Sequence, residues 1–380
     1  YLNVKGIQAW TCDHQSAGYS VGIRSRSVEC PADSQGLDDG RCSCSDACYE
    51  EDTCPVGNPT LPAQGIKLHR ETLAATGAVS ALPFELFYRS RHSGDTLVPM
   101  TLWHHTYQAA VVEHRWSSLV MYAVRTDGRV HRFDGHYDSQ YEIIWSSGDT
   151  PDILTRTAYG WRLKRQDTDQ VETYNLQGQL TSIQQRNGWV TRLRYNAQHQ
   201  LVRVTSPFGR DLVLGYDAHG WLQRVTFPDG SYAMLGHDAL GNLSTLTYPD
   251  GRVRAFHYED SVHPQALTGY SDAGQRLSHY AYDTQGRVMA SQGVGDAQPL
   301  RFAYGFNAES LPNTTITEQR PEGMVQLTQT FFAQGRVLRT NSITRSSNET
   351  QRMLYNAQGK KLREQHTDGR VSFYTYNAKG

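Results

Sequence analysis

From residue 174 onward, apolar and polar positions recur every 21 residues, not at the 3.6-residue period of an amphipathic helix. A Tyr-Asn/Asp-x-x-Gly-x-Leu motif begins at Tyr174, and equivalent aromatic positions follow at 195, 216, 237 and 258. The spacing then loosens to between 22 and 27 residues and returns to 21 at the end. The residues that define the copies are Tyr174, Gly178, Tyr195, Tyr216, Gly220, His237, Gly241, Tyr258, Tyr282, Gly286, Tyr355, Gly359, Tyr376 and Gly380.

A second turn signal lies inside each period. Asn187-Gly188, Phe208-Gly209, Asp229-Gly230 and Asp250-Gly251 are again 21 residues apart, and Asp368-Gly369 recurs near the end. Asn-Gly and Asp-Gly favour tight hairpin turns because both residues tolerate positive φ. Two turns in 21 residues leave two segments of strand length, too short for helices. Each repeat therefore predicts a β-hairpin.

The side-chain alternation predicts one packed and one partly solvated face of the sheet. Leucine or phenylalanine recurs two residues before each repeat aromatic, which places both sets on one strand face. The in-between positions are mixed, from Arg192 to His257. After the tyrosine turn, apolar residues recur at i and i+3, as at Leu201 and Val204. This departure from strict alternation predicts a bulge or strong twist in that strand.

The cysteines favour a stapled segment before the repeats. An even number of cysteines in a short, acidic, glycine-rich stretch with few apolar residues predicts disulfides and an oxidising compartment. The spacing lacks the paired Cys-x-x-Cys of zinc ribbons, so a metal site is the weaker alternative, and the pairing stays open. The six candidates are Cys12, Cys30, Cys42, Cys44, Cys48 and Cys54, all within residues 1–54.

Composition and charge narrow the function classes. The formal net charge is −1, from 37 basic and 38 acidic residues, which predicts no nucleic-acid partner. The longest apolar run, 119–124, is far shorter than a membrane span. The abundance of aromatic residues, with 7 Trp and 22 Tyr, leaves open a sugar-stacking surface. Packing between repeat copies is the competing interpretation of the tyrosines.

The repeat resembles the YD repeats of the Rhs family, whose relatives include Tc toxin shell proteins and the teneurins. The motif carries this resemblance over residues 174–380, and Leu82-Pro-Phe-Glu-Leu-Phe-Tyr resembles the first strand of an Rhs core. The resemblance implies an all-β fold, with hairpins side by side in a long antiparallel sheet that spirals into a hollow shell. We expect three parts: a cysteine-rich segment (1–54), an opening segment with irregular hairpins (55–173), and a YD-repeat array (174–380).

No candidate catalytic constellation emerges from the sequence. Adjacent histidines at 104 and 105 point to opposite faces of a strand, which disfavours one shared metal ion. His237 occupies a repeat tyrosine position, and the turn aspartates recur at a fixed offset, as turn chemistry requires. An acidic run at 46–52 lacks EF-hand spacing. We therefore expect no enzyme activity, no cofactor and no metal in this stretch of chain.

The resemblance implies a structural shell fragment of a secreted or surface-displayed bacterial protein. Its expected partner is the remainder of its own polypeptide, with downstream repeats and a toxin or other cargo, and we expect the chain to be the N-terminal piece of a longer protein. The alternative is an extracellular adhesion module that contacts a glycan or a protein. A sheet that ends within a repeat also predicts self-association through its edge.

Overall fold

The computed structural model describes most of the chain beyond residue 54. The described residues are 55–74, 82–91, 101–148, 150–293, 298–320, 323–334, 337–345, 350–356 and 361–376, with the backbone of Gln35–Gly36 (β1) and Cys42–Ser43 (β2). Every regular element among them is a β-strand, which confirms the all-β prediction. No helix in this part of the chain is long and apolar enough to cross a membrane. The predicted disulfides lie outside the described side chains.

Four antiparallel sheets beyond β2 follow the order of the chain. The first contains β3 (Thr60–Leu61), β4 (Ile66–Ala74), β5 (Phe84–Arg89) and β6 (Trp103–His105). The second contains β7 (Ala110–His114), β8 (Ser117–Val124), β9 (Val130–Tyr137) and β10 (Ile143–Ser146).

The third sheet has 13 strands and the fourth has 9, each strand paired with the next along the chain. The 13 strands are β11 (Ile153–Thr157), β12 (Gly160–Lys164), β13 (Val171–Tyr174), β14 (Leu180–Gln184), β15 (Val190–Tyr195), β16 (Leu201–Thr205), β17 (Asp211–Tyr216), β18 (Leu222–Thr226), β19 (Tyr232–His237), β20 (Leu243–Thr247), β21 (Val253–His257), β22 (Gly269–Asp272) and β23 (Gln275–Arg276). The 9 are β24 (His279–Tyr282), β25 (Val288–Gln292), β26 (Leu300–Phe306), β27 (Pro312–Arg320), β28 (Gly323–Gln334), β29 (Val337–Arg345), β30 (Thr350–Tyr355), β31 (Lys361–Gln365) and β32 (Val371–Phe373).

The chain divides into two compact units. One is His69–Leu277, and the other combines Tyr1–Leu68 with Ser278–Gly380. The predicted boundaries at 54/55 and 173/174 follow sequence motifs and stay a prediction. The unit His69–Leu277 holds the 13-stranded sheet.

The bulge predicted after the tyrosine turn is present in successive repeats. Tyr195 pairs with Leu201 while Arg194 pairs with Arg203, so Val202 is the extra residue between them. The same shift leaves one extra residue in the pairs of β17 with β18 and of β19 with β20. Because of the extra residue, Leu201 and Val204 both face the packed side and are both buried.

The two faces of the 13-stranded sheet differ as the alternation predicted. Leu193, Leu214, Leu235 and Phe256 are buried, whereas Arg192 and its equivalents on the opposite face are exposed or half-buried. In the second set of turns, only the glycine takes a positive φ, for example 87° at Gly188, and the preceding Asn187 does not. The aspartate or asparagine instead accepts a hydrogen bond from the backbone two residues on, at 3.1 Å from Asn187 to Trp189 N.

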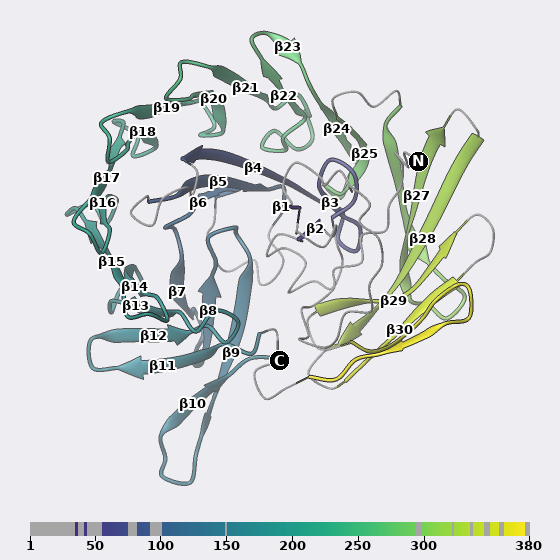
Figure 1. Ribbon diagram of the computed structural model, residues 1–380, viewed down its shortest axis with the longest axis horizontal. Helices are drawn as coiled ribbons and strands as arrows, with labels where there is room; N and C mark the ends of the chain where they lie inside the picture. Colours follow the sequence, from purple (N-terminus) through teal and green to yellow (C-terminus); the bar gives the residue numbers. More distant parts are fainter. Residues whose placement is uncertain are drawn as a thin grey trace. The chain divides into compact units, whose positions relative to one another are not determined.

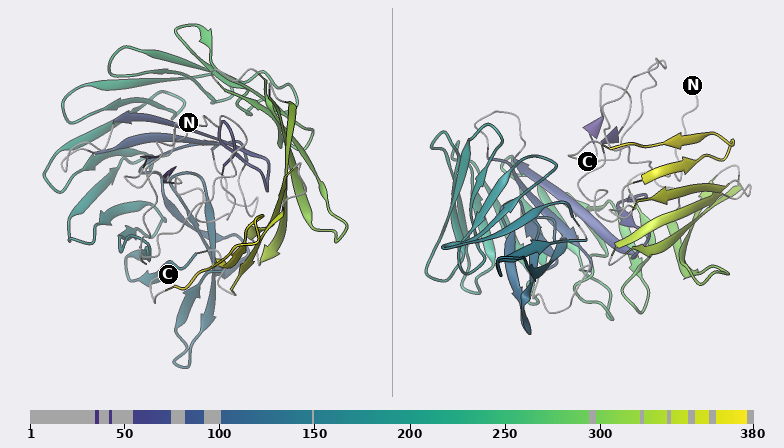
Figure 2. Two further views of the ribbon diagram at one scale, coloured as in Figure 1. Left: turned by 45° about the vertical axis from the view of Figure 1, so that its right-hand side comes forward. Right: turned by 90° about the horizontal axis from the view of Figure 1, so that it is seen from below.

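The packed face is concave, and strands from the opening segment lie against it. Figures 1 and 2 show β5, β6 and the later part of β4 inside the curve of β15–β22. The indole of Trp103 donates to the Tyr258 hydroxyl at 2.8 Å. The Tyr88 hydroxyl accepts from Leu267 N at 2.8 Å and donates to the Gln265 carbonyl at 3.2 Å. Contacts far apart in sequence therefore fix these strands on the sheet.

Candidate functional site on the concave face

The repeat tyrosines join each hairpin to the one before it. The hydroxyls of Tyr195, Tyr216 and Tyr258 each donate to the backbone carbonyl 15 residues earlier, at 2.9 Å. Burial raises the pKa of Tyr216 to about 12, so the hydroxyl stays a donor at neutral pH. A phenol that spans neighbouring hairpins satisfies a carbonyl beside the bulge and covers apolar surface. In the other unit, Tyr355 and Tyr376 make the equivalent bonds.

The second and fifth motif positions build the turn itself. The Asp217 carboxylate accepts from His219 N and Trp221 N, both at 2.9 Å, and Asn196 does the same in its own turn. The fifth position takes a positive φ at Gly178, Gly220, Gly241 and Gly286. In the remaining repeat positions, Tyr174 is buried in β13, Tyr282 ends β24, and Gly359 and Gly380 lie outside the described residues.

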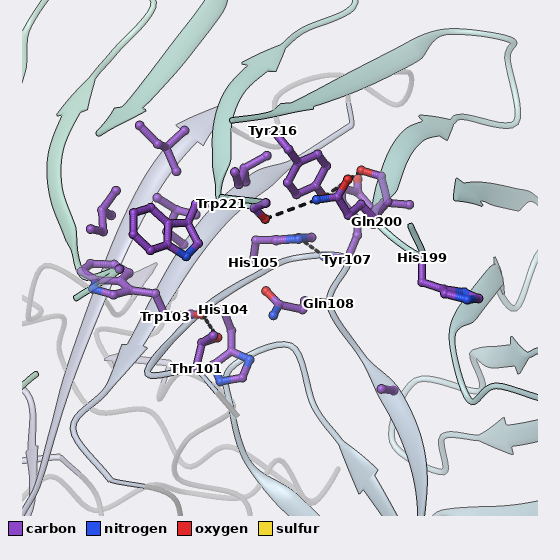
Figure 3. Close-up of a pocket in the computed structure, with 18 of the residues that line it drawn as sticks. Thr101, Trp103, His104, His105, Tyr107, Gln108, His199, Gln200, Tyr216 and Trp221 are labelled. Atoms are coloured by element: carbon purple, nitrogen blue, oxygen red, sulfur yellow. Dashed lines mark hydrogen bonds between the residues drawn. The ribbon is translucent and has the colours of Figure 1, made fainter. Parts of the chain in front are cut away.

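Trp221 and His237 depart from the repeat, and both line the same cavity. His237 replaces a tyrosine, and in the described structure it makes no hydrogen bond to the Leu222 carbonyl, which a repeat tyrosine would reach. Trp221 occupies the position at which neighbouring copies carry an amide (Gln179, Gln200), and its ring lies 5.5 Å from that of His237. The cavity has a volume of about 350 Å³ and lies between β6 with the residues after it and the concave face of the sheet (Figure 3).

The histidines of β6, His104 and His105, form part of the wall of this cavity. His105 stacks on Phe84 with ring centroids 5.2 Å apart, and its Nδ1 accepts from Tyr107 N at 3.2 Å. Burial, with the charge of His104 as a smaller cause, lowers the pKa of His105 to about 3, so its ring is neutral at pH 7. Within the described residues, no group of three or more His, Cys, Asp or Glu side chains is placed to hold a metal ion.

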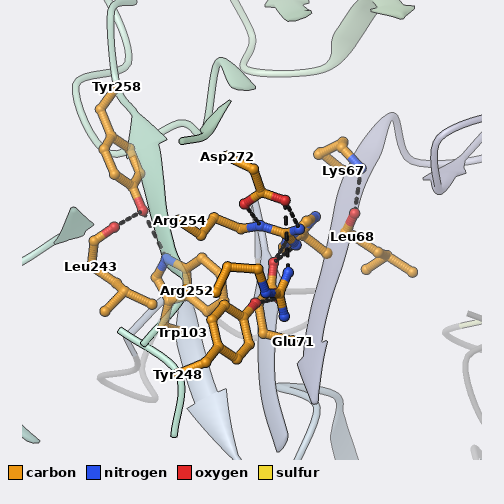
Figure 4. Close-up of polar contacts among 11 residues, drawn as sticks. Lys67, Leu68, Glu71, Trp103, Leu243, Tyr248, Arg252, Arg254, Tyr258 and Asp272 are labelled. Atoms are coloured by element: carbon orange, nitrogen blue, oxygen red, sulfur yellow. Dashed lines mark hydrogen bonds and ion pairs between the residues drawn. The ribbon is translucent and has the colours of Figure 1, made fainter. Parts of the chain in front are cut away.

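A buried charged network holds β4 on the concave face (Figure 4). The Glu71 carboxylate pairs with Arg254 at 2.6 Å, accepts from the Tyr248 hydroxyl, and lies 2.5 Å from His69 Nε2. Arg254 also pairs with Asp272 at 2.7 Å. Burial alone would raise the pKa of Glu71, but His69 and Arg254 together lower it to about 2. The carboxylate is therefore charged and fully engaged at neutral pH.

A second buried network joins the end of β8 to the start of the repeats. The Arg125 guanidinium makes a two-pronged contact with Glu172 of β13, at 2.7 and 2.8 Å, and the Tyr174 hydroxyl donates to the same carboxylate. Burial alone would raise the pKa of Glu172, yet the Arg125 charge lowers it. Sequence patterns missed both networks, because the partners are up to 183 residues apart and their pairing does not recur from one repeat to the next.

The turn aspartates act on the backbone, as their fixed offset predicted. Asp127, Asp229, Asp250 and Asp368 each accept from the amide two residues on, at 3.0 to 3.2 Å. They are spread along the chain at separate turns. None of these four carboxylates lines the cavity on the concave face, whose lining offers ring stacking, apolar contact and amide hydrogen bonds.

Comparison with known proteins identifies the repeat. A family model described as teneurin YD-shell matches residues 103–379. No curated protein gives a significant match.

Solved structures give weaker likenesses. The TcdB2-TccC3-TEV crystal structure has a TM-score of 0.37 and 12% identity over 91% of this chain and 22% of its own. TcdB2-TccC3-Cdc42 has 0.35 and 13% identity over 84% and 21%. The Photorhabdus luminescens Tc holotoxin pore has 0.34 and 14% identity, also over 84% and 21%. The chain thus spans about a fifth of the length of these structures.

Proposed function

Because the chain belongs to the teneurin YD-shell family, we propose that it forms part of the wall of a protein shell. The shell encloses or presents another segment of the same polypeptide, and the wall itself has no enzyme activity. One observation carries this proposal: the concave face of the 13-stranded sheet already binds strands β4–β6 of its own chain through buried contacts. A wall that binds its own chain from the inside is suited to holding a further segment there.

We extend the proposal to the nature of the enclosed segment, which is a toxin, and to a location outside the cytoplasm. The Rhs-type motif supports a bacterial source and a toxin as the enclosed segment. The cysteine-rich residues 1–54 support an oxidising compartment, either secreted or at the cell surface. The partner is then the rest of the polypeptide, and a second copy joined through a sheet edge is a further partner to test.

Limited proteolysis of the complete natural polypeptide tests enclosure. We expect the segment beyond the repeats to survive protease doses that remove exposed loops, and to be cut once denaturant opens the wall. Mass spectrometry of the fragments over time gives the two rates. Cleavage of that segment at equal rates in the folded and the denatured protein would rule out enclosure.

Exposed aromatic side chains favour a second candidate, an extracellular contact module. Trp116, Tyr141 and Tyr159 are 75%, 86% and 86% exposed, so their rings are accessible to a glycan or a protein. Binding of the intact protein to a glycan array would support adhesion. Binding that persists after alanine replaces these three residues would place the contact elsewhere.

A further inference from the structure

The cavity on the concave face is lined by Trp221 and His237, two residues that depart from the repeat. In the neighbouring copies, the tyrosine hydroxyl reaches back 15 residues, and the amide at the position after the glycine reaches forward to the next turn. Gln179 donates to the His199 carbonyl at 3.0 Å and Gln200 to the Gly220 carbonyl at 3.4 Å. At the corresponding positions of two successive copies, Trp221 makes ring contacts in place of the amide bond, and His237 is shorter than a tyrosine. Trp221 and His237 therefore replace hydrogen bonds between neighbouring copies with aromatic rings that line the cavity.

Trp221 is held in place by its neighbours. The His219 ring stacks on it at 4.8 Å with an interplanar angle of 19°, and His237 lies on it at 5.5 Å. A side chain at Gly241 would come within 3.1 Å of the indole, so glycine there leaves room for the ring. Trp103 comes from β6, across the cavity, and its indole nitrogen is engaged by Tyr258. Two indoles that neighbouring side chains hold in place thus line the cavity, one from β6 and one from the turn before β18 (Figure 3).

The lining restricts the chemistry of an occupant. None of the described residues that line the cavity is Asp, Glu, Lys or Arg. Leucines and the rings of Tyr195 and Tyr216 provide apolar contact, and the Gln108 amide provides a hydrogen-bonding group. The volume, about 350 Å³, lies at the lower end of the range for small-molecule sites. A site of this kind suits an uncharged planar ring with one polar group.

We infer that this cavity binds a neutral aromatic ring of about the size of an indole, with Trp221 and Trp103 contacting the ring and His237 leaving the space for it. The ring has two sources that share this chemistry: a free small molecule, or an aromatic side chain of a peptide segment. The inference rests on the cavity residues and does not require the shell to be closed.

Ligand-observed NMR on the intact protein tests the inference with three probes. Indole represents the free ring, N-acetyl-L-tryptophanamide the ring in a peptide, and indole-3-acetate a charged ring. We expect saturation transfer to indole, to the amide, or to both, and at least fivefold weaker binding of indole-3-acetate. Binding of indole alone points to a free molecule, and binding of the amide alone to a peptide segment. No transfer to either neutral probe would overturn the inference.

Substitutions that restore the repeat provide the specific control. His237→Tyr should narrow the cavity beside Trp221, add a hydroxyl donor to the Leu222 carbonyl, and lower binding at least tenfold without loss of thermal stability. Trp221→Gln should lower binding by removing the stacking ring. Met234→Tyr, on the same strand but the opposite face, should leave binding unchanged. Unchanged binding in both His237→Tyr and Trp221→Gln would show that the probes bind elsewhere. Failure of protease protection, by contrast, would bear only on enclosure.

Discussion

His199 adopts the left-handed backbone conformation that most copies assign to glycine, with φ of 63°. A residue with a Cβ atom is strained there by roughly 1–2 kcal/mol, whereas glycine is not. Glycine has more freedom in the unfolded chain, which offsets part of this gain, so His199→Gly should raise the free energy of unfolding by about 1 kcal/mol. Urea denaturation measures the change. Gln198→Gly, in the same turn but without positive φ, should lower stability, and an equal gain from both variants would contradict the conformational explanation.

Gly178 and Gly188 share a positive φ but differ in surroundings. A Cβ atom at Gly178 would lie 1.8 Å from the Val111 carbonyl oxygen, whereas nothing lies within 4 Å of one at Gly188. Gly188→Ala should cost about 1 kcal/mol from backbone strain alone. Gly178→Ala should cost about 2–4 kcal/mol, because it also disturbs the hydrogen bond from Val111 N to the Gly178 carbonyl. Thermal unfolding of the two variants side by side gives the difference, and similar losses would contradict the predicted clash.

At the scale of elements, the Glu71 network makes the docking of β4 depend on pH. A carboxylate whose folded pKa is about 2 and whose ordinary value is 4.5 stabilises the fold fully above pH 4.5, and this contribution falls as the pH drops towards 2. The shift corresponds to about 3 kcal/mol at neutral pH. Glu71→Gln should lower stability at pH 7 and lose less between pH 5 and 3 than the native protein. Urea midpoints at pH 7, 5 and 3 measure this, with Glu113→Gln on the exposed side of β7 as control.

The Arg125–Glu172 pair predicts a related effect between β8 and β13. Arg125→Met leaves a buried carboxylate without its guanidinium and should cost about 3–5 kcal/mol. The double variant Arg125→Met with Glu172→Leu removes both charges and should recover part of the loss. Denaturation of the single and double variants forms the cycle. A double variant whose loss equals the sum of the losses in Arg125→Met and Glu172→Leu alone would show that the pair is not coupled.

The difference between hairpins and networks explains what the sequence could predict. Hairpins, turns and the bulge at Val202 depend on residues within one 21-residue period, so repetition exposed them. The Asn-Gly and Asp-Gly pairs predict the hairpin turns. Only the structure shows that Gly188 takes a positive φ and Asn187 does not. Glu71 and Arg254 meet across 183 residues and have no repeated counterpart, so no local pattern signals their contact. The cavity likewise arises from packing between β6 and the sheet.

At the scale of the molecule, the 13-stranded sheet is a nearly one-dimensional array in which each strand pairs within the sheet only with its neighbours along the chain. Interior strands have two partners and the two outermost have one, so local opening should begin at β11 and β23. Hydrogen exchange of the intact protein should therefore show faster exchange in β11 and β23 than in β16–β20. Equal protection throughout would indicate that the sheet opens only as a whole.

The extra residue in each post-turn strand has a consequence for how such a wall can change over evolutionary time. Leu201 and Val204 both face the packed side only because Val202 is inserted between them. Deleting Val202 would shift the residues on one side of it to the other face, and so turn apolar side chains outward. Duplication of a complete 21-residue copy keeps both the face and the register. We therefore expect the sheet to lengthen in whole-repeat steps, with single-residue insertions and deletions tolerated mainly in the loops between strands.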